Sequence, residues 1–263
     1  MNIFDSHCHL DDPAFNKDVG EVIDRARKAG VTGMLIAGID RISSEKALSI
    51  ARSFDGVYTS VGFHPHDSKT CSEEDLDHLK MLVRDSKVCA WGEIGLDFNR
   101  MFSPREIQEK WFVKQIEIAT ELDLPIILHE RDTRGRLIEI LKTHGQKGRP
   151  AVVHCFSGNR NELRAYLDFG YSIGITGIVT QNERGSDLQK LCGTIPMERL
   201  LIETDAPYLT PLPEKKNTRR NEPAFVRSVL SKLARIRKED PERLADATWK
   251  NTCRLFRIKP LPS

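Results

Sequence analysis

The hydrophobic and polar positions along the chain follow two alternating patterns. Short runs recur that are continuously apolar, as expected for parallel strands covered on both faces. Between them lie amphipathic segments with an apolar residue every three or four positions, which is the period of a helix with one buried face. The eight runs predicted to be strands are residues 2–5, 33–37, 57–62, 88–91, 125–128, 151–153, 171–175 and 200–202.

Several segments between these runs are predicted to be helices. Residues 19–28 place their apolar side chains on one face. The segment 103–106 reads Ser-Pro-Arg-Glu, which predicts Ser103 as the N-cap and Pro104 as the first helical residue. Asp240 and Pro241 repeat this signal before a final helix that runs through Arg254.

This alternation predicts a single domain over residues 1–263, folded as a (β/α)8 TIM-type barrel with an additional C-terminal helix. Eight strands in 263 residues leave about 33 residues per unit, the size of a βα repeat. An open doubly wound sheet is the alternative. It has less support, because no Gly-x-Gly-x-x-Gly segment follows the first strand.

Composition excludes several classes of protein. The chain has 40 Lys and Arg against 38 Asp and Glu, so any polyanion site must be a local patch. No apolar run is long enough to span a membrane, and residues 1–5 carry no secretory signal. The six cysteines are scattered, which favours free thiols in a reducing compartment. We therefore expect a cytoplasmic protein with no membrane partner and no obligate protein partner.

Residues that bind metals lie at the ends of five predicted strands. Each could have an ordinary structural role, but in a TIM barrel these ends assemble the active site. Four imidazoles and two carboxylates suit zinc, manganese or related divalent ions. Because six ligands are too many for one tetrahedral ion with an open position, we expect two ions bridged by one carboxylate, that of Glu93. The candidate ligands are His7, His9, Glu93, His129, His154 and Asp205.

Two further polar residues accompany these ligands. His64 follows the third strand and could contact a substrate phosphate, bind a third ion or be an ordinary loop histidine, whereas His66 is expected in solvent. Glu203 points to the same side as Asp205, so it could orient a ligand, bind a metal or substrate, or fill the barrel interior.

Cations are candidates for binding phosphate groups. Arg131 follows the fifth strand. The loop after the eighth strand holds four cations in six residues, Lys215, Lys216, Arg219 and Arg220. They could bind a nucleic-acid backbone or form a solvated loop. The aromatic residues best placed to stack on bases are Phe98, Phe156 and Tyr208.

Six motifs in this order resemble the TatD family of metal-dependent deoxyribonucleases, in the amidohydrolase superfamily. They are Asp-Ser-His-Cys-His-Leu at 5–10, Gly-Phe-His-Pro-His at 62–66, Gly-Glu-Ile-Gly-Leu-Asp at 92–97, His-Glu-Arg-Asp at 129–132, His-Cys-Phe-Ser-Gly at 154–158 and Glu-Thr-Asp-Ala-Pro-Tyr at 203–208. The resemblance implies the same six ligands and admits magnesium beside zinc or manganese, with two or three ions in all. It also implies 3'-5' exonuclease hydrolysis of DNA, with the backbone and ends as partner, in repair or DNA fragmentation.

The expected mechanism is two-metal activation of water, in which Asp205 binds one ion and accepts the proton of the water. Two other functions remain open from the residues alone. The same ions could serve a hydrolase of a small ester, lactone or cyclic amide, because fold and ligands do not identify the substrate. The other alternative is a non-enzymatic protein that binds metal or nucleic acid. It is disfavoured, because six polar ligands at an open barrel mouth resemble a catalytic site more than a closed structural one.

Overall fold

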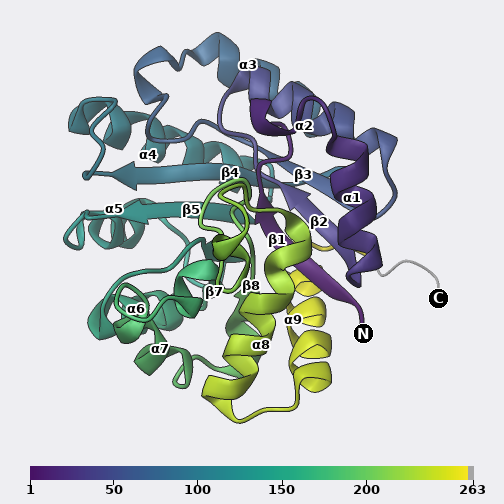
Figure 1. The fold of residues 1–263 in the computed structure, drawn as a ribbon. Helices are drawn as coiled ribbons and strands as arrows, with labels where there is room; N and C mark the ends of the chain where they lie inside the picture. The colour runs from purple at the N-terminus through teal and green to yellow at the C-terminus, as the bar shows by residue number, and fades with distance from the viewer. Residues whose placement is uncertain (260–263) are drawn as a thin grey trace. The chain divides into compact units, whose positions relative to one another are not determined.

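The computed structural model describes residues 1–259 and contains alternating strands and helices (Figure 1). The strands are β1 (Ile3–Cys8), β2 (Val31–Ile36), β3 (Val57–Val61), β4 (Val88–Asp97), β5 (Ile126–Arg131), β6 (Ala151–Val153), β7 (Ser172–Ile175) and β8 (Leu200–Ile202). The α-helices are α1 (Val19–Lys28), α2 (Arg41–Ser53), α3 (Glu73–Leu82), α4 (Arg105–Glu121), α5 (Arg136–His144), α6 (Arg160–Asp168), α7 (Ser186–Cys192), α8 (Val226–Arg237) and α9 (Pro241–Leu255).

All eight predicted strands are present, but three extend further than predicted. β1, β4 and β5 continue through His7, Glu93 and His129, which the sequence pattern placed just after the strands. The pattern fails here because polar residues interrupt the apolar runs although their backbones remain extended. Three of the six candidate ligands, His7, Glu93 and His129, therefore lie within strands.

The internal contacts of the chain divide it into two compact units. We name Met1–Ile36, Cys155–Asn159 and the described residues from Ile173 onward the terminal unit. The central unit comprises Ala37–His154 and Arg160–Ser172.

In the terminal unit, β1 pairs in parallel with β2, and β7 pairs in parallel with β8. The predicted additional C-terminal helix is present as α9, and it packs against β1 and β8. The Phe4 and Trp249 rings lie 5.3 Å apart, and the Asn251 amide donates to the carbonyl oxygen of Leu200. α8 and α9 lie side by side in this unit (Figure 1).

In the central unit, β3, β4, β5 and β6 pair in parallel in chain order. α4 packs on β4, and two buried glutamines on this helix form hydrogen bonds with β4 and with the segment after β3. Gln115 accepts from the backbone N–H of Phe63 and from the indole of Trp91. Gln108 accepts from the N–H of Asp97 and donates to its carbonyl oxygen. These bonds hold the end of β4 in one position.

The two predicted helix starts have different outcomes. Asp240 caps α9 through its carboxylate, as predicted. At α4 the cap is Pro104 and not Ser103, because the Ser103 hydroxyl donates to the carbonyl oxygen of His66 instead. None of the helices within residues 1–259 is long and apolar enough to cross a membrane.

Candidate metal centre

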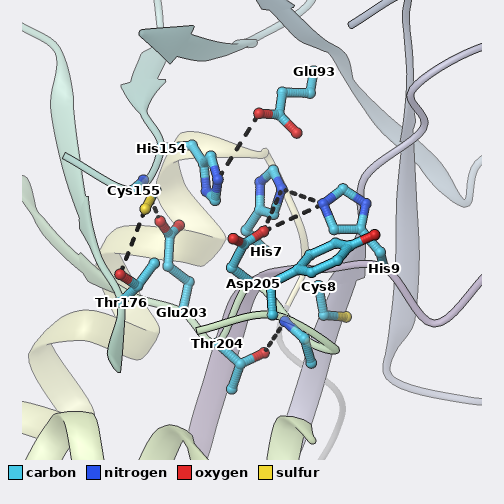
Figure 2. Close-up of polar contacts among 12 residues, drawn as sticks. His7, Cys8, His9, Glu93, His154, Cys155, Thr176, Glu203, Thr204 and Asp205 are labelled. Carbon is cyan, nitrogen blue, oxygen red and sulfur yellow. Dashed lines mark hydrogen bonds and ion pairs between the residues drawn. The ribbon is translucent and has the colours of Figure 1, made fainter. Parts of the chain in front are cut away.

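The central unit brings three predicted ligands together. Glu93 lies in β4, His129 in β5, and His154 directly after β6. One carboxylate oxygen of Glu93 lies 2.6 Å from Nδ1 of His129 and 3.8 Å from Nε2 of His154. Figure 2 shows the contact between Glu93 and His154. The three residues each offer a ligand atom within 4.8 Å of the others, so they form a group that could hold one metal ion. We name it the central ligand group.

A glycine allows β4 and β5 to approach closely at this point. Gly95 is paired with His129 in the sheet, and its φ of +147° is one that residues with a side chain rarely adopt. A Cβ atom at this position would overlap the carbonyl oxygen of His129. Gly95 therefore allows the backbones of β4 and β5 to approach closely at His129.

Two carboxylates, those of Glu93 and Asp97, lie beside His129. Burial lowers its pKa, but hydrogen bonds with Asp97 and Glu93 outweigh that effect and raise the pKa of His129 to about 10. A position between carboxylates that retains a proton this strongly also favours a metal cation.

Asp97 is a site residue that the sequence analysis missed, although it ends a motif that the analysis singled out. Its carboxylate is 1% exposed, and Oδ2 lies 2.7 Å from Nε2 of His66 and 3.3 Å from Nε2 of His129. Burial opposes its ionisation, but these imidazoles and the N–H of Arg100 hold the pKa of Asp97 well below its usual range. His66 is therefore half-buried beside a carboxylate, which corrects the expectation that it lies in solvent.

His64 lies at the edge of the central ligand group. Its Nε2 is 3.1 Å from Nδ1 of His129 and 3.5 Å from Oε1 of Glu93. Its other ring nitrogen accepts from the backbone N–H of His66, so Nε2 carries the proton of the neutral ring. With this proton, His64 could donate a hydrogen bond to a phosphate, and together with His66 and His129 it also forms a group that could hold a metal ion.

The terminal unit brings together the other three predicted ligands, His7, His9 and Asp205 (Figure 2). The Nε2 atoms of His7 and His9 are 3.2 Å apart. Oδ1 of Asp205 lies 3.3 Å from Nε2 of His9 and 3.9 Å from Nε2 of His7. We name these residues the terminal ligand group.

Backbone bonds between β1 and the loop after β8 form the terminal ligand group. The N–H of Asp205 donates to the carbonyl oxygen of His7, and the N–H of His9 donates to that of Ala206. His7 and His9 point to the same side because they are two positions apart on an extended segment. These backbone bonds bring ligands that are far apart in the sequence next to one another.

Glu203 is almost fully buried in the terminal unit. Oε1 accepts from the N–H of Cys155, and Oε2 accepts from the hydroxyl of Ser6. A Cβ at position 174 would lie 2.5 Å from Oε2, so Gly174 makes room for the carboxylate. These contacts support an orienting role for Glu203 beside β1 and leave its predicted role in substrate binding as a prediction.

Among the predicted phosphate-binding cations, Lys215 and Arg219 are exposed, and Arg131 is half-buried at the end of β5. Arg220 differs, because its guanidinium binds Asp18 and Glu222 in an ion-pair network that includes Arg25. It therefore has a structural role in the terminal unit, which corrects its inclusion with the solvent-facing cations.

The three candidate stacking residues differ in their exposure and contacts. Phe156 is 2% exposed and packs in the interior, so it cannot contact a base. Tyr208 is 53% exposed, its ring lies 6.0 Å from that of His9, and its hydroxyl donates to Asp12. Phe98 is half-buried beneath the guanidinium of Arg105.

The donor sets fit divalent metal ions. Each ligand group combines imidazole nitrogens with a carboxylate oxygen, which are the ligands of zinc and manganese sites. In the central ligand group the ring nitrogen of His129 faces Glu93 at hydrogen-bond distance, so both atoms are already directed at one point. No disulfide joins any of the six cysteines, which all lie within residues 1–259.

The chain is similar to known proteins over almost its whole length. Residues 4–257 match the family model described as TatD related DNase. The chain is 43% identical over 258 residues to the 3'-5' ssDNA/RNA exonuclease TatD of Citrobacter koseri, covering 97% of this chain and 99% of the relative.

Solved structures show the same fold. The TatD homolog YjjV of Escherichia coli has a TM-score of 0.90 and 32% identity, with 98% of both chains covered. A TatD family hydrolase of Entamoeba histolytica has a TM-score of 0.88 and 26% identity, with 98% of this chain and 99% of that chain covered. The predicted (β/α)8 TIM-type fold is thereby confirmed. The match over nearly the whole length establishes that this chain belongs to the TatD-related DNase family, in the amidohydrolase superfamily.

Proposed function

We propose that this protein is a divalent-metal-dependent exonuclease that removes nucleotides from the 3' end of single-stranded DNA or RNA. Membership of the TatD-related DNase family supports phosphodiester hydrolysis. The name of the Citrobacter koseri relative, at 43% identity over nearly the whole chain, supports the polarity and the single-stranded substrate.

We further propose that residues 1–263 act as one barrel domain with a two-metal centre. In a (β/α)8 barrel the carboxyl ends of all strands surround one mouth, where catalytic residues gather. The terminal ligand group would supply His7, His9 and Asp205, and the central ligand group would supply Glu93, His129 and His154. The absence of disulfides among the cysteines is consistent with a cytoplasmic protein.

The bound ions, zinc, manganese or magnesium, would neutralise phosphate oxygens and lower the pKa of a water. The protein's own residues would provide the remaining functions. Glu93 would bridge the ions through its carboxylate, and Asp205 would accept the proton of the water. Arg131, Lys215 and Arg219 are the cations proposed to hold the phosphate backbone, and His64 can donate from Nε2 to a phosphate oxygen.

The observation that supports this function most directly is the contact of one Glu93 oxygen with both His129 and His154. A buried carboxylate that two imidazoles approach from separate strands offers oxygen and nitrogen donor atoms that converge on one place. A hydrolytic metal ion is the partner that fits these ligands.

The test is digestion of end-labelled single-stranded DNA and RNA by chelator-treated protein, with Mg²⁺, Mn²⁺ or Zn²⁺ added back separately. We expect stepwise shortening from the 3' end only when a metal is present. Glu93→Ala should remove this activity and most of the bound metal, whereas Glu74→Ala on the surface of α3 should retain both.

Two results would contradict the proposal. Metal-dependent hydrolysis of small esters or lactones without any nuclease activity would indicate a small-molecule hydrolase on the same scaffold. Retention of nucleic acid without turnover under every metal condition would indicate a binding protein.

A further inference from the structure

The carboxylate of Asp97 has four hydrogen-bond donors around it in the central unit. Oδ1 accepts from the backbone N–H groups of Asn99, at 2.9 Å, and Arg100, at 2.8 Å. Oδ2 faces Nε2 of His66 at 2.7 Å and Nε2 of His129 at 3.3 Å. One oxygen therefore shapes the loop after β4, and the other faces two imidazoles, one of which belongs to the central ligand group.

An ionised carboxylate can only accept hydrogen bonds, so the imidazole nitrogens that face Oδ2 must carry protons. His129 therefore keeps a proton on Nε2. The nitrogen that remains for a metal is Nδ1, which faces Oε1 of Glu93 at 2.6 Å. With the opposite tautomer, a proton would occupy the position where the metal has to bind.

We propose that Asp97 is a positioning residue that holds the proton of His129 on Nε2 and thereby presents Nδ1 as the metal ligand. Carboxylates that bind the second nitrogen of a ligating histidine fix its tautomer and orientation in many metal sites. His66 supports this arrangement by donating to the same oxygen. The inference rests on the proposed metal centre and adds a residue outside its six ligands.

The two oxygens of Asp97 have separable roles, which makes Asp97→Asn a sharp test. The amide oxygen can still accept from Asn99 and Arg100, so the loop after β4 is retained. The amide NH₂ group then replaces Oδ2 and is a donor, so His129 can approach it only with an unprotonated Nε2. Nδ1 must then carry the proton, and metal binding there is opposed.

Asp85→Asn is the matched control in the same unit. Asp85 also accepts from a backbone N–H, that of Lys87 at 2.8 Å, and pairs with one cationic side chain, Arg52, at 2.8 Å. Both substitutions remove one negative charge and keep one side-chain oxygen that accepts from the backbone. Only Asp97→Asn changes the partner of a metal ligand.

The experiment measures zinc binding by calorimetry on chelator-treated protein, together with ¹⁵N NMR of the histidine rings in the zinc-loaded wild type. We expect a proton on Nε2 of His129 and zinc on Nδ1. Asp97→Asn should weaken binding of one zinc ion about 10–100-fold. Asp85→Asn should bind zinc within threefold of the wild type, and thermal melting of the metal-free variants should show that both are folded.

The possible failures are distinguishable. Zinc coordination through Nε2 of His129, or zinc affinity of Asp97→Asn within threefold of the wild type, would overturn the role of Asp97 and leave the metal centre intact. A wild-type protein that binds no divalent metal would overturn the proposed function as well.

Discussion

Asp5 and Thr204, 199 positions apart in the sequence, are joined by two hydrogen bonds. The N–H of Thr204 donates to Oδ1 of Asp5 at 2.8 Å, and its hydroxyl donates to Oδ2 at 2.5 Å. Asp5 precedes His7 in β1, and Thr204 precedes Asp205 in the loop after β8. This pair therefore connects the two segments that carry the terminal ligand group.

The Asp5–Thr204 pair predicts a pH-dependent stability. Burial raises the pKa of Asp5 to about 8, against the opposing effect of the hydrogen bonds from Thr204. Because the unfolded chain has the usual pKa near 4, the folded protein binds more protons between about pH 4 and 8, and its stability falls as pH rises through this range. The contribution of this group is at most about 1.4 kcal/mol per pH unit.

Asp5→Asn should remove the contribution of this group to the change in the free energy of unfolding with pH, because an amide does not titrate. The measurement is urea unfolding of chelator-treated protein at several values between pH 5 and 8. Asp24→Asn, on exposed α1 surface, is the control and should keep the slope of the wild type. An equal slope in Asp5→Asn and the wild type would assign the pH dependence to other groups.

Gly95→Ala is expected to be severely destabilising. A methyl group at this position would overlap the carbonyl oxygen of His129, and the φ of +147° is strained for alanine. We expect a loss of about 2–4 kcal/mol in the free energy of unfolding. Metal affinity should fall too, because β5 must move away from Glu93.

Gly193→Ala is the matched control for this substitution. Gly193 has a helical φ of −69°, and a Cβ atom there would meet nothing within 4 Å. Chemical denaturation should show unchanged stability or a gain below about 1 kcal/mol. Comparable stability in both glycine variants would show that the close approach of β4 and β5 is not required.

Lys215→Ala combined with Arg219→Ala should weaken binding of single-stranded DNA and reduce its salt dependence. Both side chains are exposed in the loop after β8. If each binds one phosphate, the slope of the logarithm of affinity against the logarithm of salt concentration should become less steep by about 1.4. Fluorescence anisotropy at several salt concentrations, with a metal that does not support cleavage, measures this slope.

Arg220→Ala is the comparison within the same loop. Because its guanidinium binds Asp18 and Glu222, we expect a stability loss of about 1–2 kcal/mol and an unchanged salt slope. A salt slope altered by Arg220→Ala and unaffected by the double substitution would reverse the roles assigned to these cations.

The sequence alone predicted eight strands and the residue types of the metal centre. It succeeded for β6 and β8 because their apolar runs end where the strands end. It placed Glu93 after β4, although the strand continues to Asp97. Glycines and acids normally interrupt strands, but here Gly95 allows close approach of β5 and Gln108 binds the backbone of Asp97.

Only tertiary structure could identify Asp97 and His66 as partners, because hydrogen bonds between residues 31 positions apart leave no periodic signal. It also showed that Arg220 forms ion pairs within the protein whereas Lys215 and Arg219 are exposed, although the three are cations of one loop in the sequence. Hydrophobic periodicity and ligand chemistry are local properties that one sequence carries. The protonation state and partner of each side chain depend on which distant groups share its surroundings, and strand pairing decides that.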